Sequence, residues 1–92
     1  MDATSREKAY KIADGWGLPP DEREQLLNQP DAAPQVISIH DALHRLFGNR
    51  EQADAWISKP NRAFQGQSGL EVMLAGDIEQ VHRHLKYHLY NA

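Results

Sequence analysis

The stretch IEQVHRHLKYHL, residues 78–89, contains the clearest structural signal in the chain. Its large aliphatic side chains Ile78, Val81, Leu85 and Leu89 follow one another at intervals of three, four and four residues, which places them on one face of an α-helix. Asp77 stands directly before this run, in the position of an N-cap residue. The stretch therefore predicts an amphipathic C-terminal helix whose apolar face packs against the rest of the domain.

Further helices are predicted by capping-box spacings, in which a residue that accepts a backbone hydrogen bond is followed three positions later by Glu or Gln. Such pairs begin at Thr4, Asn49 and Ser68, and apolar residues at helical spacing follow each of them. Gly15 is expected to be the left-handed stop of the first of these helices. The two prolines at residues 19–20 suit the start of another, short helix.

A proline-bearing loop is predicted between this N-terminal part and the remaining chain. Residues 29–35 contain two prolines and no large apolar side chain, which is typical of a linker or an ordered loop. The apolar face that runs from Ile39 to Phe47 predicts a helix that Gly48 ends. Residues 35–39 are the only stretch compatible with a short strand.

We expect an all-α fold of five or six short helices in one compact domain, because 92 residues rarely build two hydrophobic cores. The predicted organisation is a short N-terminal helical region, residues 1–34, followed by a C-terminal helical bundle, residues 35–92. Trp56 is expected to be the buried centre of the core. The apolar residues on the predicted inward faces, which should form this core, are Leu43, Phe47, Trp56, Ile57, Leu70, Leu74, Val81 and Leu85.

Composition and charge disfavour several classes of function. The chain has no cysteine, which removes disulfides and thiolate chemistry, and its apolar runs are too short to span a membrane. Because the first residues do not have the pattern of a secretory signal, we expect a cytoplasmic protein without membrane contacts. Residues 1–34 carry four bases against seven acids, and the net charge of the chain is −3. Phosphate backbones are bound by concentrated cations, so this charge pattern disfavours nucleic-acid binding.

Histidine is the main candidate for metal or catalytic chemistry. His40 and His44 are four residues apart, as are His84 and His88, so each pair shares one helix face. A tetrahedral zinc site needs further ligands, and neither pair belongs to a His-Glu-x-x-His motif. Ser68 lacks the glycine-flanked turn of a serine nucleophile. We therefore expect no catalytic residue, no metal, no cofactor and no enzymatic activity.

An ordered set of aromatic, proline and glycine residues reads Trp-x-x-x-Pro-Asn-x-x-Phe-x-Gly at residues 56–66. It is followed by a Ser-Gly-Leu helix start at residues 68–70 and by the amphipathic C-terminal run. This order resembles the toxin-binding domain of the Xre/MbcA/ParS-type bacterial antitoxins over residues 38–92. Gly69 departs from the pattern, because the family usually has proline at this position.

The resemblance implies an antitoxin of a type II toxin–antitoxin system. Its partner would be a RES-domain toxin, which consumes NAD, and the antitoxin would inhibit this toxin by covering its active site. Rigid aromatic and arginine side chains concentrate binding energy at interfaces of this kind. The candidate toxin contacts are Pro60, Asn61, Arg62, Phe64, Lys86, Tyr87, Leu89 and Tyr90.

The alternative function is that of a DNA-binding transcriptional regulator. Members of the family typically begin with a helix-turn-helix module, and residues 1–34 would be a degenerate or truncated form of it. Residues 29–34, where the turn and recognition helix should follow, contain no lysine or arginine that could reach phosphates or base edges. Homo-oligomers are common among proteins of this type, but no heptad pattern here indicates a number of subunits.

Overall fold

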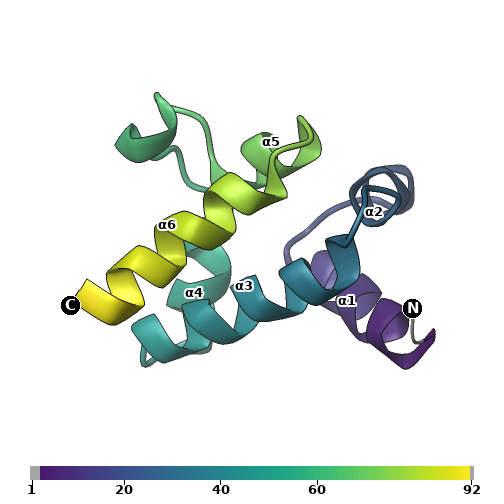
Figure 1. Cartoon of the computed structure of the whole chain (residues 1–92), viewed down its shortest axis with the longest axis horizontal. Helices are drawn as coiled ribbons and strands as arrows, with labels where there is room; N and C mark the ends of the chain where they lie inside the picture. The colour runs from purple at the N-terminus through teal and green to yellow at the C-terminus, as the bar shows by residue number, and fades with distance from the viewer. Residues whose placement is uncertain (1–2, 92) are drawn as a thin grey trace.

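The computed structural model describes residues 3–91, and helices account for most of this range (Figure 1). Within it, six α-helices and one 3-10 helix follow one another without a strand: α1 (Ala3–Gly15), α2 (Pro20–Leu27), α3 (Ala32–Leu46), α4 (Arg50–Ser58), η1 (Arg62–Phe64), α5 (Gly69–Leu74) and α6 (Ile78–Asn91). The prediction of an all-α fold with five or six helices is confirmed. None of the helices described has both the length and the apolar character needed to cross a bilayer.

Three of the predicted helix starts are capped by side chains, as their spacing indicated. Asn49 Oδ1 accepts hydrogen bonds from two backbone N–H groups in the first turn of α4, at 2.7 and 3.2 Å. Ser68 and Glu71 form a capping box at α5, in which each side chain accepts the other residue's backbone N–H, at 3.1 and 3.0 Å. Asp77 Oδ1 accepts a backbone N–H of the first turn of α6 at 3.3 Å. Local hydrogen bonds thus define where these helices begin.

The N-terminal half differs from the predicted boundaries in three places. Thr4 was expected to cap the first helix, but α1 starts before it and Thr4 lies inside the helix. The left-handed residue after α1 is Gly17, with φ of 89°, and not Gly15. Helix α3 begins at Ala32, inside the region predicted to be a loop. Pro34 is compatible with this start, because the N–H group that proline lacks is not needed in the first turn of a helix.

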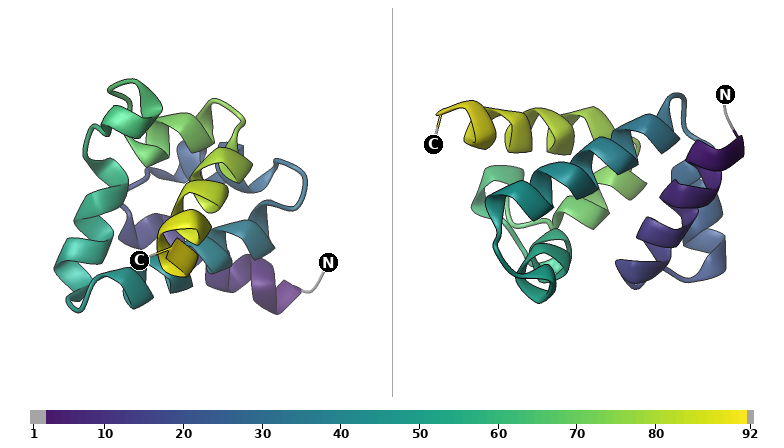
Figure 2. Two further views of the ribbon diagram at one scale, coloured as in Figure 1. Left: turned by 60° about the vertical axis from the view of Figure 1, so that its left-hand side comes forward. Right: turned by 90° about the horizontal axis from the view of Figure 1, so that it is seen from below.

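Helix α3 is the central helix of the molecule. It packs against α1 on one side and against α6 on the other, and α6 packs in turn against α5 (Figure 2). Its inward side chains Val36, Ile39 and Leu43 are fully buried. One continuous core joins side chains from α1 through α6, so both of the ranges predicted as separate regions contribute to it. The division into residues 1–34 and 35–92 stays a prediction.

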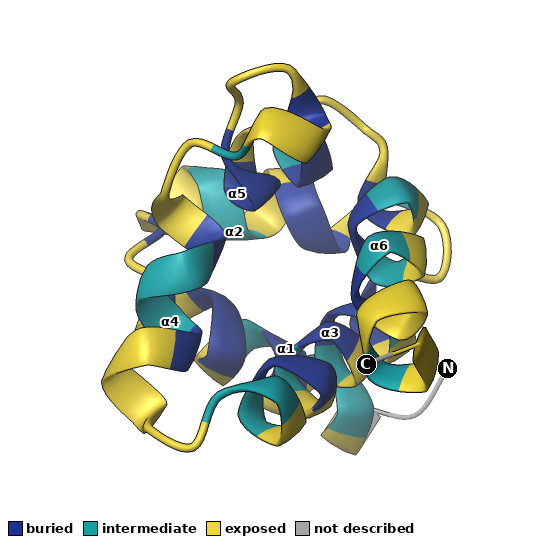
Figure 3. Cartoon of the chain, turned by 90° about the vertical axis from the view of Figure 1, so that its left-hand side faces the viewer, coloured by how far each residue is buried: buried dark blue, intermediate teal, exposed yellow. Residues whose placement is uncertain are grey.

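The buried sides of the helices turn toward one another around this core (Figure 3). Trp56 is not its buried centre, contrary to expectation, because Ala53 and Ile57 occupy the buried face of α4 and Trp56 packs against the core from its edge. The eight predicted core residues divide accordingly into a buried group, Leu43, Ile57, Leu70, Val81 and Leu85, and a partly exposed group at the edge, Phe47, Trp56 and Leu74.

Two glutamine side chains connect the N-terminal region to α5. Gln25 Nε2 donates a hydrogen bond to the carbonyl oxygen of Leu74 at 3.1 Å, and Gln29 Nε2 donates to that of Met73 at 2.8 Å. The last carbonyl groups of a helix have no partner within the helix. These two amides therefore complete the carboxyl end of α5 and hold α2 beside it.

Candidate functional site

Residues 59–68, here called the Pro-Asn loop, connect α4 to α5. Asn61 organises this loop, because its Oδ1 accepts the backbone N–H of Ala63 at 2.9 Å and its backbone carbonyl accepts the N–H groups of Phe64 and Gly66, each at 3.0 Å. An asparagine suits the position, since its side-chain oxygen can bond the backbone two residues further on. The motif residue Asn61 therefore holds the loop together from inside.

The two ends of the Pro-Asn loop are also tied to each other. The backbone N–H of Asn61 donates to the carbonyl oxygen of Gln67 at 2.9 Å, and Pro60 pairs with Ser68 in an isolated antiparallel bridge. Between these contacts the chain reverses at Gly66, whose φ of 88° is a conformation that glycine adopts without a steric penalty. The proline, asparagine and glycine of the motif thus produce a closed backbone loop whose shape does not depend on a partner.

A cluster of rings joins the Pro-Asn loop to α4 and α6. Phe64 meets the rings of His84 and Trp56 edge-on, with centroid separations of 5.1 and 6.2 Å. Trp56 and His84 are stacked, 5.9 Å apart with an interplanar angle of 17°. Burial lowers the pKa of His84, and the nearby His88 lowers it further, because both disfavour the charged imidazole. Phe64 itself is only 3% exposed, so it supports the loop from beneath, and its ring does not face outward as expected for a contact residue.

Gly69, where the family pattern usually has proline, lies against the side chains of α4. A Cβ atom at this position would lie 3.1 Å from Ile57 Cδ1 and 3.4 Å from Trp56 Cζ3. The first separation is shorter than the usual contact between carbon atoms. Helix α5 therefore approaches α4 so closely that a glycine fits its first position without displacing either side chain.

The carboxyl-terminal half of α6 carries the large apolar side chains that are most exposed among the residues described. Tyr87 and Tyr90 are 64% and 79% exposed, and this end of α6 lies opposite α1 and α2 (Figure 1). Lys86, Leu89 and Tyr90 line a groove between α6 and α3, and the α3 side of the groove includes Arg45. The sequence did not single out Arg45, because its position in this groove depends on how α3 packs against α6.

The predicted toxin contacts fall on two neighbouring parts of the surface. A row of ring contacts connects these parts, running from Phe64 through His84 and His88 to Tyr87 with successive centroid separations of 5.1, 4.5 and 5.7 Å. In the sequence, the two histidines were considered for metal or catalytic chemistry and not for ring packing, although their four-residue spacing was the available signal for this row. The loop contributes Pro60, Asn61 and Arg62, and α6 contributes Lys86, Tyr87, Leu89 and Tyr90.

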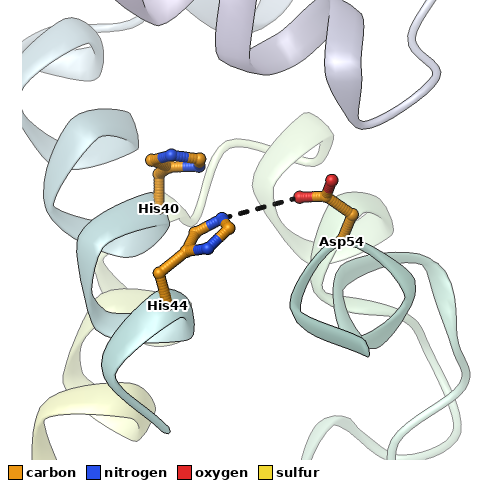
Figure 4. Close-up of side chains that lie close together, drawn as sticks. All are labelled: His40, His44 and Asp54. Carbon is orange, nitrogen blue, oxygen red and sulfur yellow. Dashed lines mark ion pairs between the residues drawn. The ribbon is translucent and has the colours of Figure 1, made fainter. Parts of the chain in front are cut away.

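A second group of polar side chains lies between α3 and α4. His40 and His44 project from α3 toward Asp54 of α4, and His44 Nε2 lies 3.9 Å from Asp54 Oδ1 (Figure 4). The two imidazole rings are 4.2 Å apart. Burial lowers the pKa of His40, and the neighbouring His44 acts in the same direction. The packing of α4 against α3 thereby brings a carboxylate beside the histidine pair. The spacing of residues along the sequence does not indicate this carboxylate.

Comparison with known proteins connects this architecture to a family. The family model for the antitoxin Xre/MbcA/ParS C-terminal toxin-binding domain matches residues 42–88, which is just over half of the chain. The chain belongs to the Xre/MbcA/ParS antitoxin family. The span that matches this antitoxin domain contains the Pro-Asn loop, the ring cluster and Tyr87, whereas Leu89 and Tyr90 lie directly after it. An antitoxin role is therefore supported by the part of the chain that carries most of the candidate surface.

The likeness to known sequences extends outside the antitoxin domain. The chain is 32% identical to the Uncharacterized protein y4oB of Sinorhizobium fredii (strain NBRC 101917 / NGR234) over 101 aligned residues, which cover 88% of this chain and 78% of that protein. This coverage is larger than the span of the family match, so part of the similarity lies outside residues 42–88. No solved structure matches the chain.

Proposed function

We propose that this chain is the cytoplasmic antitoxin of a type II toxin–antitoxin system and that it inhibits a RES-domain, NAD-consuming toxin by covering its active site. Family membership supports the antitoxin role, and the RES type of partner follows from what the resemblance implies. The observation that carries the proposal is the pair of exposed tyrosines on α6, Tyr87 and Tyr90, beside the closed Pro-Asn loop.

The physical argument for toxin binding is that the loop and side chains of this surface need little further ordering when a partner binds. Association costs free energy when loops and side chains become fixed. The Pro-Asn loop already has its backbone hydrogen bonds, centred on Asn61, and a tyrosine has only two side-chain torsions to restrict. Tyrosine and arginine are also enriched among the residues that dominate interface energies. Arg62 and Tyr90, both exposed, are therefore the side chains expected to contribute most to toxin binding.

Co-expression with the product of the neighbouring gene tests this proposal. We expect the neighbour alone to deplete cellular NAD and stop growth, and co-expression of this chain to restore both. Arg62→Ala and Tyr90→Ala should reduce rescue and co-purification without changing the melting temperature. Lys11→Ala is the matched control, because Lys11 is an exposed cation on α1, away from this surface. A neighbour that is not toxic and is not retained by the purified chain contradicts the proposal, and a bound toxin that leaves NAD unchanged contradicts the RES assignment.

The alternative of a DNA-binding regulator can be tested with the same purified chain. Two of the four bases in residues 1–34 are engaged within the domain: Arg6 donates to the carbonyl oxygen of Leu27 at 3.1 Å, and Arg23 pairs with Asp14. We therefore expect no binding of duplex DNA at low salt. An affinity that falls steeply as salt rises would favour the regulator instead, because it would show the release of counterions from phosphates.

A further inference from the structure

We propose that His40, His44 and Asp54 form a binding site for a divalent transition-metal cation, with Zn²⁺ as the best match. Each of the three residues offers one ligand atom, and these atoms all lie within 4.8 Å of one another. The two histidines come from successive turns of α3 and the aspartate comes from α4 (Figure 4). The site is separate from the proposed toxin-binding surface and does not depend on the proposed function.

The three ligand atoms, which lie within 4.8 Å of one another, must move closer together to bind zinc. Ligand atoms at 2.0–2.2 Å from a tetrahedral zinc ion are about 3.3–3.6 Å from each other. His44 Nε2 and Asp54 Oδ1 are 3.9 Å apart, so this pair would have to approach by about 0.3–0.6 Å. A pair at the 4.8 Å limit of the group would have to approach by more than about 1 Å. All three side chains are partly exposed, and rotation about their side-chain torsions can supply such a movement without a change in the backbone.

Two imidazole nitrogens at this place are buried without a hydrogen-bond partner among the residues described. They are Nδ1 of His40 and Nε2 of His44. Buried polar atoms are normally satisfied, and an exception calls for an explanation such as an ion. A metal ion between α3 and α4 would accept the lone pair of one nitrogen from each histidine. The orphaned nitrogens are therefore an observation that supports a ligand here, in addition to the clustering of the three residues.

The donor set selects the class of metal. Imidazole nitrogen suits zinc, copper and nickel, whereas calcium and magnesium prefer oxygen ligands. Two histidines with one carboxylate supply three ligands, and a fourth position open to solvent is usual in zinc sites with three protein ligands. The cavity beside His40 and Asp54 is lined also by Lys8, Lys11 and Arg50, and the positive charges of these side chains lower the affinity for a cation.

Arg50 is the cation that competes most directly with a metal at this site. Its Nε lies 3.8 Å from Asp54 Oδ2, and its side chain is 84% exposed. An exposed ion pair of this kind contributes little to stability, and it involves the carboxylate oxygen that does not face His44. Arg50 therefore lowers the affinity for a metal without blocking the site, and its removal should make binding tighter.

Calorimetric titration of the chelator-treated chain with zinc chloride, together with thermal denaturation, tests the site. We expect one zinc ion per chain and a melting temperature raised by on the order of 10 °C when free zinc reaches about a hundredfold excess over its Kd. His44→Gln and Asp54→Asn should weaken binding by more than about tenfold, since even residues that only support metal ligands commonly have effects of this size. Arg50→Ala should strengthen it.

His84→Gln is the matched control, because His84 and His88 have the same four-residue spacing on α6 but belong to no group of three metal-ligating side chains in the part of the chain that the structure describes. This variant should bind zinc as the parent does. The proposal is overturned if zinc neither binds nor raises the melting temperature, if Asp54→Asn binds as tightly as the parent, or if His84→Gln rather than His44→Gln removes binding. Cobalt provides a second readout, because its visible absorption reports the coordination geometry directly.

Discussion

Replacement of Asn61 by alanine removes one side-chain acceptor from the Pro-Asn loop. The lost contact is the hydrogen bond at 2.9 Å from the N–H of Ala63 to Asn61 Oδ1. The backbone bonds of the same residue, to Phe64, Gly66 and Gln67, can still form without its side chain, but they should open more often once the loop has lost this contact. Asn61 caps the 3-10 helix in the manner of an N-cap, and loss of such a cap costs about 1 kcal/mol. For a domain of this size, the melting temperature should fall by about 4–8 °C.

Thermal denaturation followed by far-UV circular dichroism measures this loss, and two variants serve as controls. Asn61→Asp keeps the acceptor oxygen and should melt close to the parent. Asn49→Ala removes a comparable cap at the start of α4, where Asn49 Oδ1 accepts two backbone N–H groups, so it should cost a similar amount without opening the loop. Amide hydrogen exchange separates these cases, because only Asn61→Ala should speed the exchange of the Gly66 N–H.

One result would refute this reasoning about the loop. If Asn61→Ala melted like the parent and the Gly66 amide kept its protection, the side-chain hydrogen bond would contribute nothing to the closed conformation. The surrounding contacts, in particular the buried Phe64 ring, would then hold the loop by themselves.

Three further perturbations follow from burial and charge. Leu85→Ala should lower the free energy of unfolding by about 2–5 kcal/mol in urea denaturation, because Leu85 is fully buried and its removal leaves a cavity; a loss within error would contradict its place in the core. Tyr90→Ala should change the free energy of unfolding by less than about 0.5 kcal/mol, since its side chain is exposed, and a large loss would show that it packs against the domain. Because burial lowers the pKa of His84 below the ordinary histidine value of about 6.5, the unfolded chain binds more protons than the folded chain between the two pKa values. The contribution of His84 to stability is therefore present above pH 6.5 and is lost as the pH falls from 6.5 toward the folded-state pKa. The melting temperature should fall with the pH in this range, and His84→Gln should make that fall less steep. An equally steep fall in the variant would contradict the prediction.

Most helix starts were predictable, because a cap involves residues that are close in sequence. Asn49, Ser68 and Asp77 all accept the backbone bonds that their spacing indicated. The start of α3 was not predictable, since a proline within the first helical turn and a proline in a loop give the same local sequence pattern. Pro34 lies in that turn because the following face, with Val36 and Ile39, is buried between α1 and α6.

The candidate surface was predictable in part. The motif located the Pro-Asn loop, and the apolar repeat of α6 left Tyr87 and Tyr90 off the buried face, where both are exposed. The individual positions of the aromatic rings could not be predicted, because large aromatic residues suit a core and an interface equally well. Trp56 was expected inside and lies at the edge, whereas Phe64, a candidate toxin contact, is buried.

By itself, the sequence determined the helical fold class, the positions of most caps, the amphipathic face of α6 and the family motif at residues 56–66. These features depend on hydrogen bonds within one turn and on the period of the α-helix, so neighbouring residues specify them. Only the tertiary structure decided that Asp54 reaches His44 and that Gln29 bonds Met73 across 44 residues of sequence. Contacts of this kind depend on how whole helices pack, and that packing is set by the volume and shape of a core to which every helix contributes.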